Sequence, residues 1–219
     1  MEIFIDKRIR DVCPQMQIGV IRCNTTNMPT SEELWSELNK ECVAIKNRYE
    51  LLQINQRPAI AKTRELYKAL GKDPNRYRVS SEALCRRAVK GMELHRINTL
   101  VDIINLLSMH SGYSIGGFDG DKIQGDMYLG VGEKDEKFEG IGRGLLNIEG
   151  LPVYRDSIGG IGSPTSDEER TKITLGTTFI HININAFEEE MILSEVMDWS
   201  KELLMKYTNA KDFEMRIIK

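Results

Sequence analysis

Glycine is distributed very unevenly along this 219-residue chain, and that distribution limits the folds it can adopt. Fifteen of the 18 glycines fall between Gly112 and Gly176. Glycine weakens helix interiors and suits tight turns and close backbone approaches, so this region should consist of short strands joined by turns. The helical patterns lie mostly before it. Helices clustered early and strands clustered later indicate an α+β fold, without the alternation typical of a doubly wound sheet.

Four helices are expected before the glycine-rich region. The sequence TSEE at residues 30–33 has the form of a capping box and should open a helix that runs to about Leu52. The next helix should span about residues 60–70 and stop at Gly71. A third should follow a cap at Ser80 or Ser81 and end near Gly91, and a fourth should cover residues 96–110.

The remaining patterns predict strands and one more helix. Strand-like alternation occurs at residues 2–5, 16–22, 126–131, 151–154, 171–175 and 178–184, and in FEMRII near the end of the chain. Asn185 should cap a C-terminal helix that begins at once after it. No linker or repeat divides the chain, so residues 1–219 are expected to form one domain. Residues 1–55 would pack on it, and residues 185–219 would add a helix and a strand.

Bulk composition places the chain among ordinary soluble globular proteins, with 41% apolar and 29% charged residues. Its apolar runs are too short to cross a membrane, and MEIFIDKRIR lacks the pattern of an export signal, so we expect a cytoplasmic location. The four cysteines form no CxxC pair and have no close histidine, which favours reduced, core-filling thiols over zinc. The three histidines are too dispersed to suggest a metal set or a triad. No metal or cofactor is expected.

Positive charge gathers in one part of this chain of net charge −3. Between Arg76 and Arg96 there are six Arg or Lys residues against Glu82 and Glu93. A basic island on an acidic protein suits a partner that carries phosphates, such as a nucleic acid. A solvated helix face with an internal Glu82–Arg86 pair is the alternative.

The predicted helix at residues 96–110 carries a polar stripe inside an apolar surface. At about 100° per residue, Asn98, Asp102 and Asn105 fall within a sector of about 60°. Apolar side chains cover most other directions, so this helix should be buried. Buried amides and carboxylates need hydrogen-bond partners. The stripe therefore indicates a ligand pocket, or a buried network that ties the helix to its neighbours.

Two polar, glycine-containing segments follow this helix. SIGGFDGDKIQG at residues 114–125 allows the backbone to approach a ligand closely but departs from an EF-hand calcium loop. Residues 154–178 place hydroxyls and carboxylates around glycines, which suits a small polar ligand or a self-capping turn.

Three stretches, taken in order, resemble a known family. YRVSSEALCRRAVKG (77–91), RINTLVDIINLLS (96–108) and GGFDGDKIQG (116–125) resemble the B3/B4 domain of the phenylalanyl-tRNA synthetase beta subunit, and most closely its free-standing relatives. The resemblance spans roughly residues 60–184. It implies an α+β domain with a β-sandwich of unusual topology flanked by helices. In the synthetase this domain removes tyrosine wrongly attached to the phenylalanine tRNA.

A free-standing relative would resemble a trans-editing deacylase that hydrolyses mischarged aminoacyl-tRNA with a positioned water. Gly116 stands where the bacterial synthetases usually carry a histidine, which leaves the amino acid open. The alternative is a non-catalytic module that binds tRNA, an amino acid or another small metabolite. The implied partners are the acceptor end of tRNA and its amino acid, with no membrane partner. The oligomeric state stays open.

The resemblance also suggests residue roles. The residues expected to act on the ester or line its pocket most directly are Asn98, Asp102, Asn105 and Asp156. The residues expected to shape the substrate pocket are Gly116, Gly117, Asp119, Thr174 and Thr177. The side chains expected to contact tRNA phosphates are Arg76, Arg78, Arg86, Arg87 and Lys90.

Overall fold

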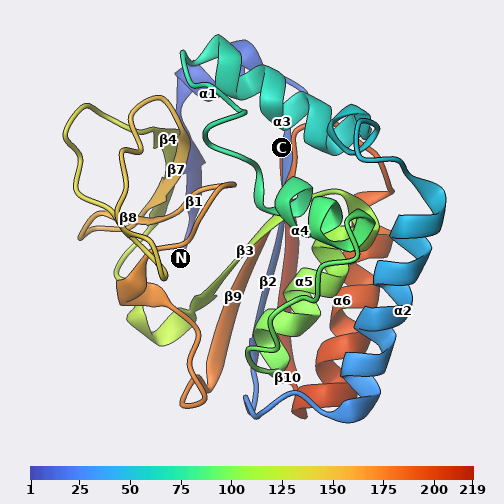
Figure 1. Cartoon of the computed structure of the whole chain (residues 1–219). Helices are drawn as coiled ribbons and strands as arrows, with labels where there is room; N and C mark the ends of the chain where they lie inside the picture. Colours follow the sequence, from blue (N-terminus) through green and yellow to red (C-terminus); the bar gives the residue numbers. More distant parts are fainter.

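Two four-stranded sheets face each other in the computed structural model, which describes residues 1–219 (Figure 1). The outer sheet has the order β1 (Ile3–Ile5), β4 (Met127–Val131), β7 (Pro152–Arg155) and β8 (Gly160–Gly162). Only its β1–β4 pair is parallel. The central sheet is antiparallel, in the order β10 (Lys211–Ile218), β2 (Gln17–Asn24), β9 (Phe179–Ala186) and β3 (Ser114–Asp119).

Strand β9 shows that the two faces of the central sheet have different surroundings. Ile180, Ile182 and Ile184 belong to the apolar core shared with the helices. The intervening residues His181, Asn183 and Asn185 are also buried and therefore point to the opposite face, between the sheets. The two sheets pack around a separate apolar cluster that includes Ile18 from β2 and Leu129 from β4. The arrangement is a β-sandwich, as the sequence led us to expect.

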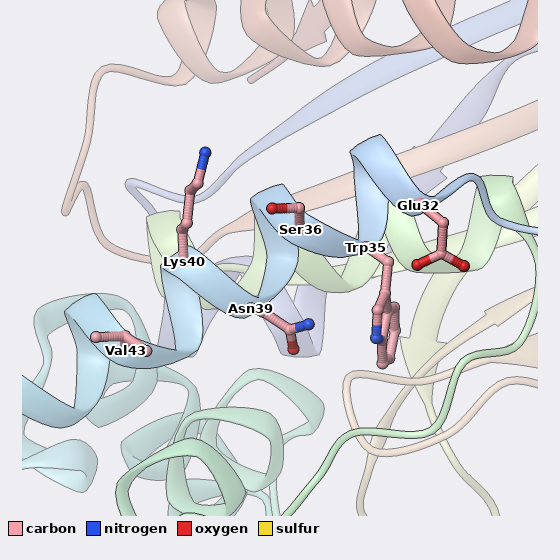
Figure 2. Close-up of a pocket in the computed structure, with 6 residues that line it drawn as sticks. All are labelled: Glu32, Trp35, Ser36, Asn39, Lys40 and Val43. Carbon is pink, nitrogen blue, oxygen red and sulfur yellow. The ribbon is translucent and has the colours of Figure 1, made fainter.

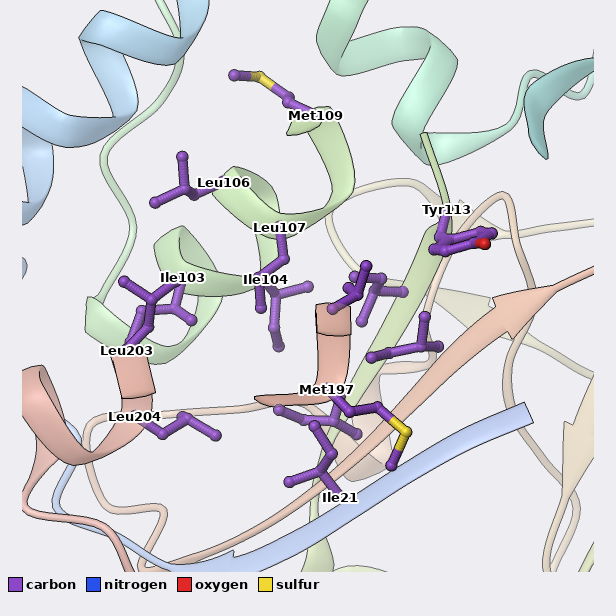
Figure 3. Close-up of a cluster of buried hydrophobic side chains, with 14 of the residues drawn as sticks. Ile21, Ile103, Ile104, Leu106, Leu107, Met109, Tyr113, Met197, Leu203 and Leu204 are labelled. Atoms are coloured by element: carbon purple, nitrogen blue, oxygen red, sulfur yellow. The ribbon is translucent and has the colours of Figure 1, made fainter. Parts of the chain in front are cut away.

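Helices cover the other face of the central sheet. They are α2 (Glu32–Arg48), α4 (Ser80–Val89), α5 (Thr99–Ser111) and α6 (Leu193–Thr208), seen to the right in Figure 1. Trp35 of α2 is half-buried and packs against the edge of this core, whereas Asn39 and Val43 on the same helix are exposed (Figure 2). Figure 3 shows Ile104 and Leu107 of α5 packed above Met197 of α6 and Ile21 of β2. Burial of such side chains contributes about 1.5–3 kcal/mol each.

Helix α5 ends where its last carbonyls find partners. Gly112 follows it with φ of +77°, a left-handed conformation that suits glycine. The buried guanidinium of Arg57 donates to the carbonyl oxygens of Met109 at 2.6 Å and His110 at 2.9 Å. Arg57 precedes α3 (Pro58–Ala69), which with α1 (Lys7–Val12) closes one end of the sandwich.

Short elements complete the chain. They are the 3-10 turns Ile54–Gln56, Gly120–Lys122 and Glu169–Thr171, and the hairpin of β5 (Glu139–Gly140) and β6 (Gly144–Leu145). No helix has the length and apolar character needed to cross a membrane.

The α+β class is confirmed, and the four early helices and most strands lie close to their predicted positions. The N-cap of α2 is Ser31, whose hydroxyl accepts the N–H of Leu34, and the helix ends at Arg48. Neither Ser80 nor Ser81 caps α4, because Val79 occupies that position. Helix α1 and strand β3 were not predicted.

Two predictions near the C-terminal half were wrong. Residues 171–175 form no strand, since a 3-10 turn ends at Thr171 and irregular backbone follows. Asn185 caps no helix but lies inside β9, and α6 begins only at Leu193. The reason is tertiary. The Asn185 amide donates to the Ser114 carbonyl at 2.9 Å and its oxygen accepts the Tyr154 hydroxyl at 2.6 Å, which satisfies a polar side chain inside the sandwich.

Candidate active site

One cavity, of about 290 Å³, receives polar and apolar side chains from several separate parts of the chain. Most of its lining residues come from α4, α5 and β3 and from the segment that follows β8. Its volume is near the lower limit for small-molecule sites, which suits a ligand of about amino-acid size. The residues that line it are Ser80, Leu84, Ile97, Val101, Ile104, Asn105, Ser108, Ile115, Gly117, Ile141, Ser163, Ser166, Asp167, Lys172 and Ile173.

Helix α5 provides one wall through its periodicity. Val101, Asn105 and Ser108 follow at steps of four and three, and Ile104 stands beside them on the same side. Gly117 on β3 keeps the opposite wall open. A Cβ atom there would lie 2.3 Å from Cδ1 of Ile104 and 3.0 Å from Cδ1 of Ile173. A side chain at Gly117 would therefore reduce the space.

Asp167 is the only acidic side chain in the lining. Its Oδ2 accepts a long hydrogen bond, 3.4 Å, from the Gly117 N–H. Lys172, the only cation in the lining, is paired with Glu169 and not with Asp167. Burial raises the pKa of Asp167 to about 7, opposed only by the Gly117 N–H. The cavity thus holds a carboxyl group without a charged partner, which can take up or release a proton near neutral pH.

Hydrogen bonds within the turn before Asp167, and from this turn to α3 and α4, fix its conformation. The Ser163 hydroxyl accepts the N–H groups of Thr165 and Ser166, at 3.3 and 3.1 Å. The hydroxyls of Tyr67 and Thr165 lie 2.9 Å apart and are buried, which ties the turn to α3. The N–H of Ser80 donates to the Pro164 carbonyl at 2.8 Å, which ties it to the start of α4. These contacts hold Asp167 in place against Gly117.

The three polar residues predicted to form a stripe on α5 do not share one environment. Asn105 lines the cavity. Asn98 is the N-cap of α5 and accepts the Val101 N–H at 3.1 Å. The carboxylate of Asp102 accepts the Thr30 hydroxyl and the Ile97 N–H, and burial raises its pKa. Neither Asn98 nor Asp102 lines the cavity, and their roles in a site stay predictions.

Asp156 lies outside the cavity lining. Its carboxylate accepts the N–H groups of Gln124, Ile158 and Gly159 and forms an ion pair with Arg170 at 2.9 Å. Burial acts to raise its pKa, but the guanidinium and the three N–H groups hold that pKa below its usual value. This carboxylate joins three loop segments.

Of the residues predicted to shape the substrate pocket, Gly117 lines the cavity, and the other four do not. Asp119 accepts the Thr177 hydroxyl at 3.0 Å, and the same hydroxyl accepts the Thr174 N–H at 2.9 Å. At Gly116 an added Cβ would lie 2.9 Å from the Phe118 ring, a residue of the core between the sheets. The part of these four residues in binding stays a prediction.

The predicted phosphate contacts lie on α4, in the segment before it or at its C-cap, and none of them lines the cavity, to which α4 contributes Ser80 and Leu84. Arg78 and Arg86 lie 3.4 and 3.8 Å from the buried carboxylate of Glu82. Arg86 and Arg87 also donate to the carbonyls of Leu51 and Glu93. Arg76 and Lys90 are exposed and form no ion pair. Several cations therefore gather along α4, and only some of them are free of ion pairs and exposed to solvent.

Asp167, Ser163 and Ser166 belong to the polar loop recognised in the sequence, but nothing singled them out as site residues. Fifty residues separate Gly117 from Asp167, so no local spacing signals their contact. Ile104 belongs to the helix that the sequence predicts to be buried, and no sequence pattern identifies Ile115 as part of a cavity wall. The one available signal was the concentration of acidic and hydroxyl side chains among glycines at residues 154–178, which does not distinguish Asp167 from its acidic neighbours.

Other parts of the molecule offer less for chemistry. A depression of about 410 Å³ runs along α2, and all six lining residues come from that helix (Figure 2). No three His, Cys, Asp or Glu side chains are grouped to hold a metal ion. The four cysteines are free, and burial raises the pKa of Cys23 to about 12. Burial lowers the pKa of His181, between the sheets, to about 4.

Comparisons with known proteins give one family. A sequence model described as "B3/4 domain" matches residues 62–211. No curated protein matches the chain. Among solved structures, the chain is similar to an N-terminal fragment of the phenylalanyl-tRNA synthetase beta subunit from Pyrococcus horikoshii, with 15% identity and a TM-score of 0.48. That alignment covers 100% of this chain and 54% of the fragment, so this chain spans about half the fragment's length.

Proposed function

Because this chain belongs to the B3/4 domain family, we propose that it is a trans-acting deacylase that hydrolyses mischarged aminoacyl-tRNA in the cavity beside α5. The observation that carries the proposal is the cavity itself. An unpaired carboxyl group, hydroxyls and aliphatic side chains converge there on a volume suited to one amino acid. The sequence resemblance to the synthetase editing domain supports the choice of reaction.

Hydrolysis of an aminoacyl ester requires few catalytic groups. Water adds to the ester carbonyl carbon, the bond to the ribose oxygen breaks, and that oxygen leaves as a hydroxyl with a proton. An aminoacyl ester is already activated, so holding the water and the ester together supplies much of the rate. In this proposal Asp167 accepts a hydrogen bond from the aminoacyl group or from the water. Ser163, Ser166 and Asn105 offer further polar contacts to the ester.

The tRNA would approach across α4. Phosphate contacts need only positive charge at the correct distance, and Arg76, Arg78 and Lys90 are exposed before and after α4, the helix whose Ser80 and Leu84 line the cavity. This contact is independent of base sequence, so the choice of substrate falls mainly to the cavity. The proposed place of action is the cytoplasm, where aminoacyl-tRNA is made and used.

A deacylation panel tests the proposal. Purified protein is incubated with tRNAs that carry labelled amino acids, correct or mismatched, and ester loss is compared with spontaneous hydrolysis. We expect acceleration for a restricted set of mismatched pairs, reduced at least tenfold in Asp167→Asn. Asp121→Asn, which removes an exposed acid outside the cavity lining, is the matched control. Unaccelerated hydrolysis of every pair by folded protein contradicts the proposal, and retained tRNA or amino-acid binding would then indicate the non-catalytic module.

A further inference from the structure

The cavity also indicates which aminoacyl group it accepts, an inference that rests on the proposed function. Seven of its 15 lining residues are hydrophobic, all of them Ile, Leu or Val, and none is aromatic. Ile104 and Ile115 are largely buried and form the floor, whereas Ile97 and Ile141 are exposed at the mouth. A side chain that enters therefore meets aliphatic groups from the mouth to the floor.

The polar groups on the other side of the cavity suit a positively charged amine. Asp167 is the only carboxyl group in the lining, it lies in a fastened turn, and no cation of the chain pairs with it. Asp167 is partly buried, and a carboxylate withdrawn from water without a partner is costly unless a ligand supplies the opposite charge. The α-ammonium of an aminoacyl ester is such a charge, and it stands one bond from the carbon that carries the side chain.

We infer that the cavity selects aminoacyl groups with a free α-amino group and an aliphatic side chain, and that Asp167 holds the ammonium while the side chain packs on Ile104 and Ile115. Asp167 is then a residue that determines specificity. A peptidyl or N-acylated group lacks the charge and leaves the carboxylate unpaired. A tyrosyl group brings a phenol hydroxyl to an aliphatic floor, where Ser108 and Asn105 are the only polar neighbours on α5.

This arrangement makes binding depend on pH. The ammonium pairs with the ionised form of the Asp167 carboxyl group, whereas burial favours the neutral form of that carboxyl group. The other charged groups around it are Lys172, which is paired with Glu169, and Glu168 in the same segment. No histidine lines the cavity. Below the pKa of Asp167, affinity should rise about tenfold for each unit of pH.

The experiment measures binding of non-hydrolysable analogues, so its result does not depend on deacylation. The probes are 3′-amino-3′-deoxyadenosine carrying isoleucine through an amide, the same compound with an acetylated α-amino group, and the tyrosine analogue. Affinities are measured by calorimetry between pH 5.5 and 7.5 for the wild type, Asp167→Asn and Asp121→Asn. Thermal melting confirms that each variant is folded.

We expect the isoleucine analogue to bind at least tenfold more tightly than its acetylated form and than the tyrosine analogue. Its affinity should rise from pH 5.5 to 7 in the wild type and in Asp121→Asn, and should be weaker and independent of pH in Asp167→Asn. Equal binding of the acetylated analogue, or an unchanged pH profile in Asp167→Asn, overturns the ammonium contact. Tighter binding of the tyrosine analogue overturns the aliphatic selection. If the isoleucine analogue binds as expected while the tRNA panel shows no hydrolysis, the proposed deacylase activity fails and this inference stands.

Discussion

The hydroxyl of Thr30 donates a hydrogen bond to the carboxylate of Asp102, 72 positions further along the chain. Thr30 precedes α2, and Asp102 lies in the first turn of α5. The same carboxylate accepts the Ile97 N–H at 3.3 Å. Asp102 therefore connects the start of one helix to the start of another, and its oxygens face the Thr30 hydroxyl, the Ile97 N–H and the Asn105 side chain.

Replacing Asp102 should affect folding more than chemistry. Asp102→Ala leaves the Thr30 hydroxyl and the Ile97 N–H without their partner, which should lower the free energy of unfolding by about 1–3 kcal/mol. Asp102→Asn keeps an accepting oxygen and should cost less. Urea denaturation measures both, and deacylation by the folded variants should match the wild type. A large loss of rate in Asp102→Asn at unchanged stability would instead place this carboxyl in the reaction.

The Asp156–Arg170 pair should stabilise the fold at neutral pH and fail in acid. The pKa of Asp156 is lowered on folding, so its contribution is complete above the unfolded value and disappears as pH falls through the folded value. Asp156→Asn should lower the free energy of unfolding by about 1–3 kcal/mol at pH 7. Its melting temperature should approach that of the wild type near pH 3. Equal melting of variant and wild type at pH 7 would contradict the role assigned to this ion pair.

An alanine at Gly117 should fill the cavity. Its Cβ would collide with the ends of Ile104 and Ile173, which line the cavity, so the new methyl group and the displaced side chains should reduce its space. We expect at least a tenfold loss of binding to the isoleucine analogue, with a smaller effect on melting temperature. Gly159→Ala is the matched control, because an added Cβ there has no atom within 4 Å and the backbone φ suits any residue. Unchanged binding in Gly117→Ala would place the ligand elsewhere.

Ionisation of Asp167 should destabilise the ligand-free protein as pH rises. Its pKa is raised on folding to about 7, so the folded state binds more protons than the unfolded state between about pH 4 and pH 7, and stability falls as pH rises through this window. Asp167→Asn does not titrate. Its melting temperature relative to the wild type should therefore be higher at pH 8 than at pH 4.5, and about 1 kcal/mol corresponds to roughly 2–4 °C. A difference that is constant with pH would contradict this expectation.

Exposed cations before and after α4 should set the salt dependence of tRNA binding. Arg76 and Lys90 form no ion pair, so Arg76→Gln with Lys90→Gln should weaken binding without loss of stability. The slope of log Kd against log salt concentration should fall by about 1 for each contact removed. Neutralising Arg86 and Arg87 should also weaken binding but should lower stability, since both donate to backbone carbonyls. Lys211→Gln, on β10, is the control, and an unchanged slope in the double variant would exclude this surface.

The sequence predicted the elements whose pattern is local. Alternation located β4 and β9, and helical periodicity with glycine stops located α3, α4 and α5. The sequence did not predict the elements whose structure depends on contacts between residues far apart in the chain. Strand β3 contains Gly116 and Gly117, and it holds because β9 pairs with it along its whole length. The cavity combined Asn105 and Gly117, which were predicted, with Asp167, whose environment depends on a contact across 50 residues.

The row of His181, Asn183 and Asn185 between the sheets has a consequence for how the chain avoids misfolding. A strand slipped by one residue exchanges its two faces. In β9 that slip would push an imidazole and two amides into the aliphatic helix layer and turn three isoleucines toward the hydrogen-bonding groups of Tyr154 and Ser114. Both changes would raise the free energy of the slipped structure. The polar residues between the sheets therefore favour the correct register of β9.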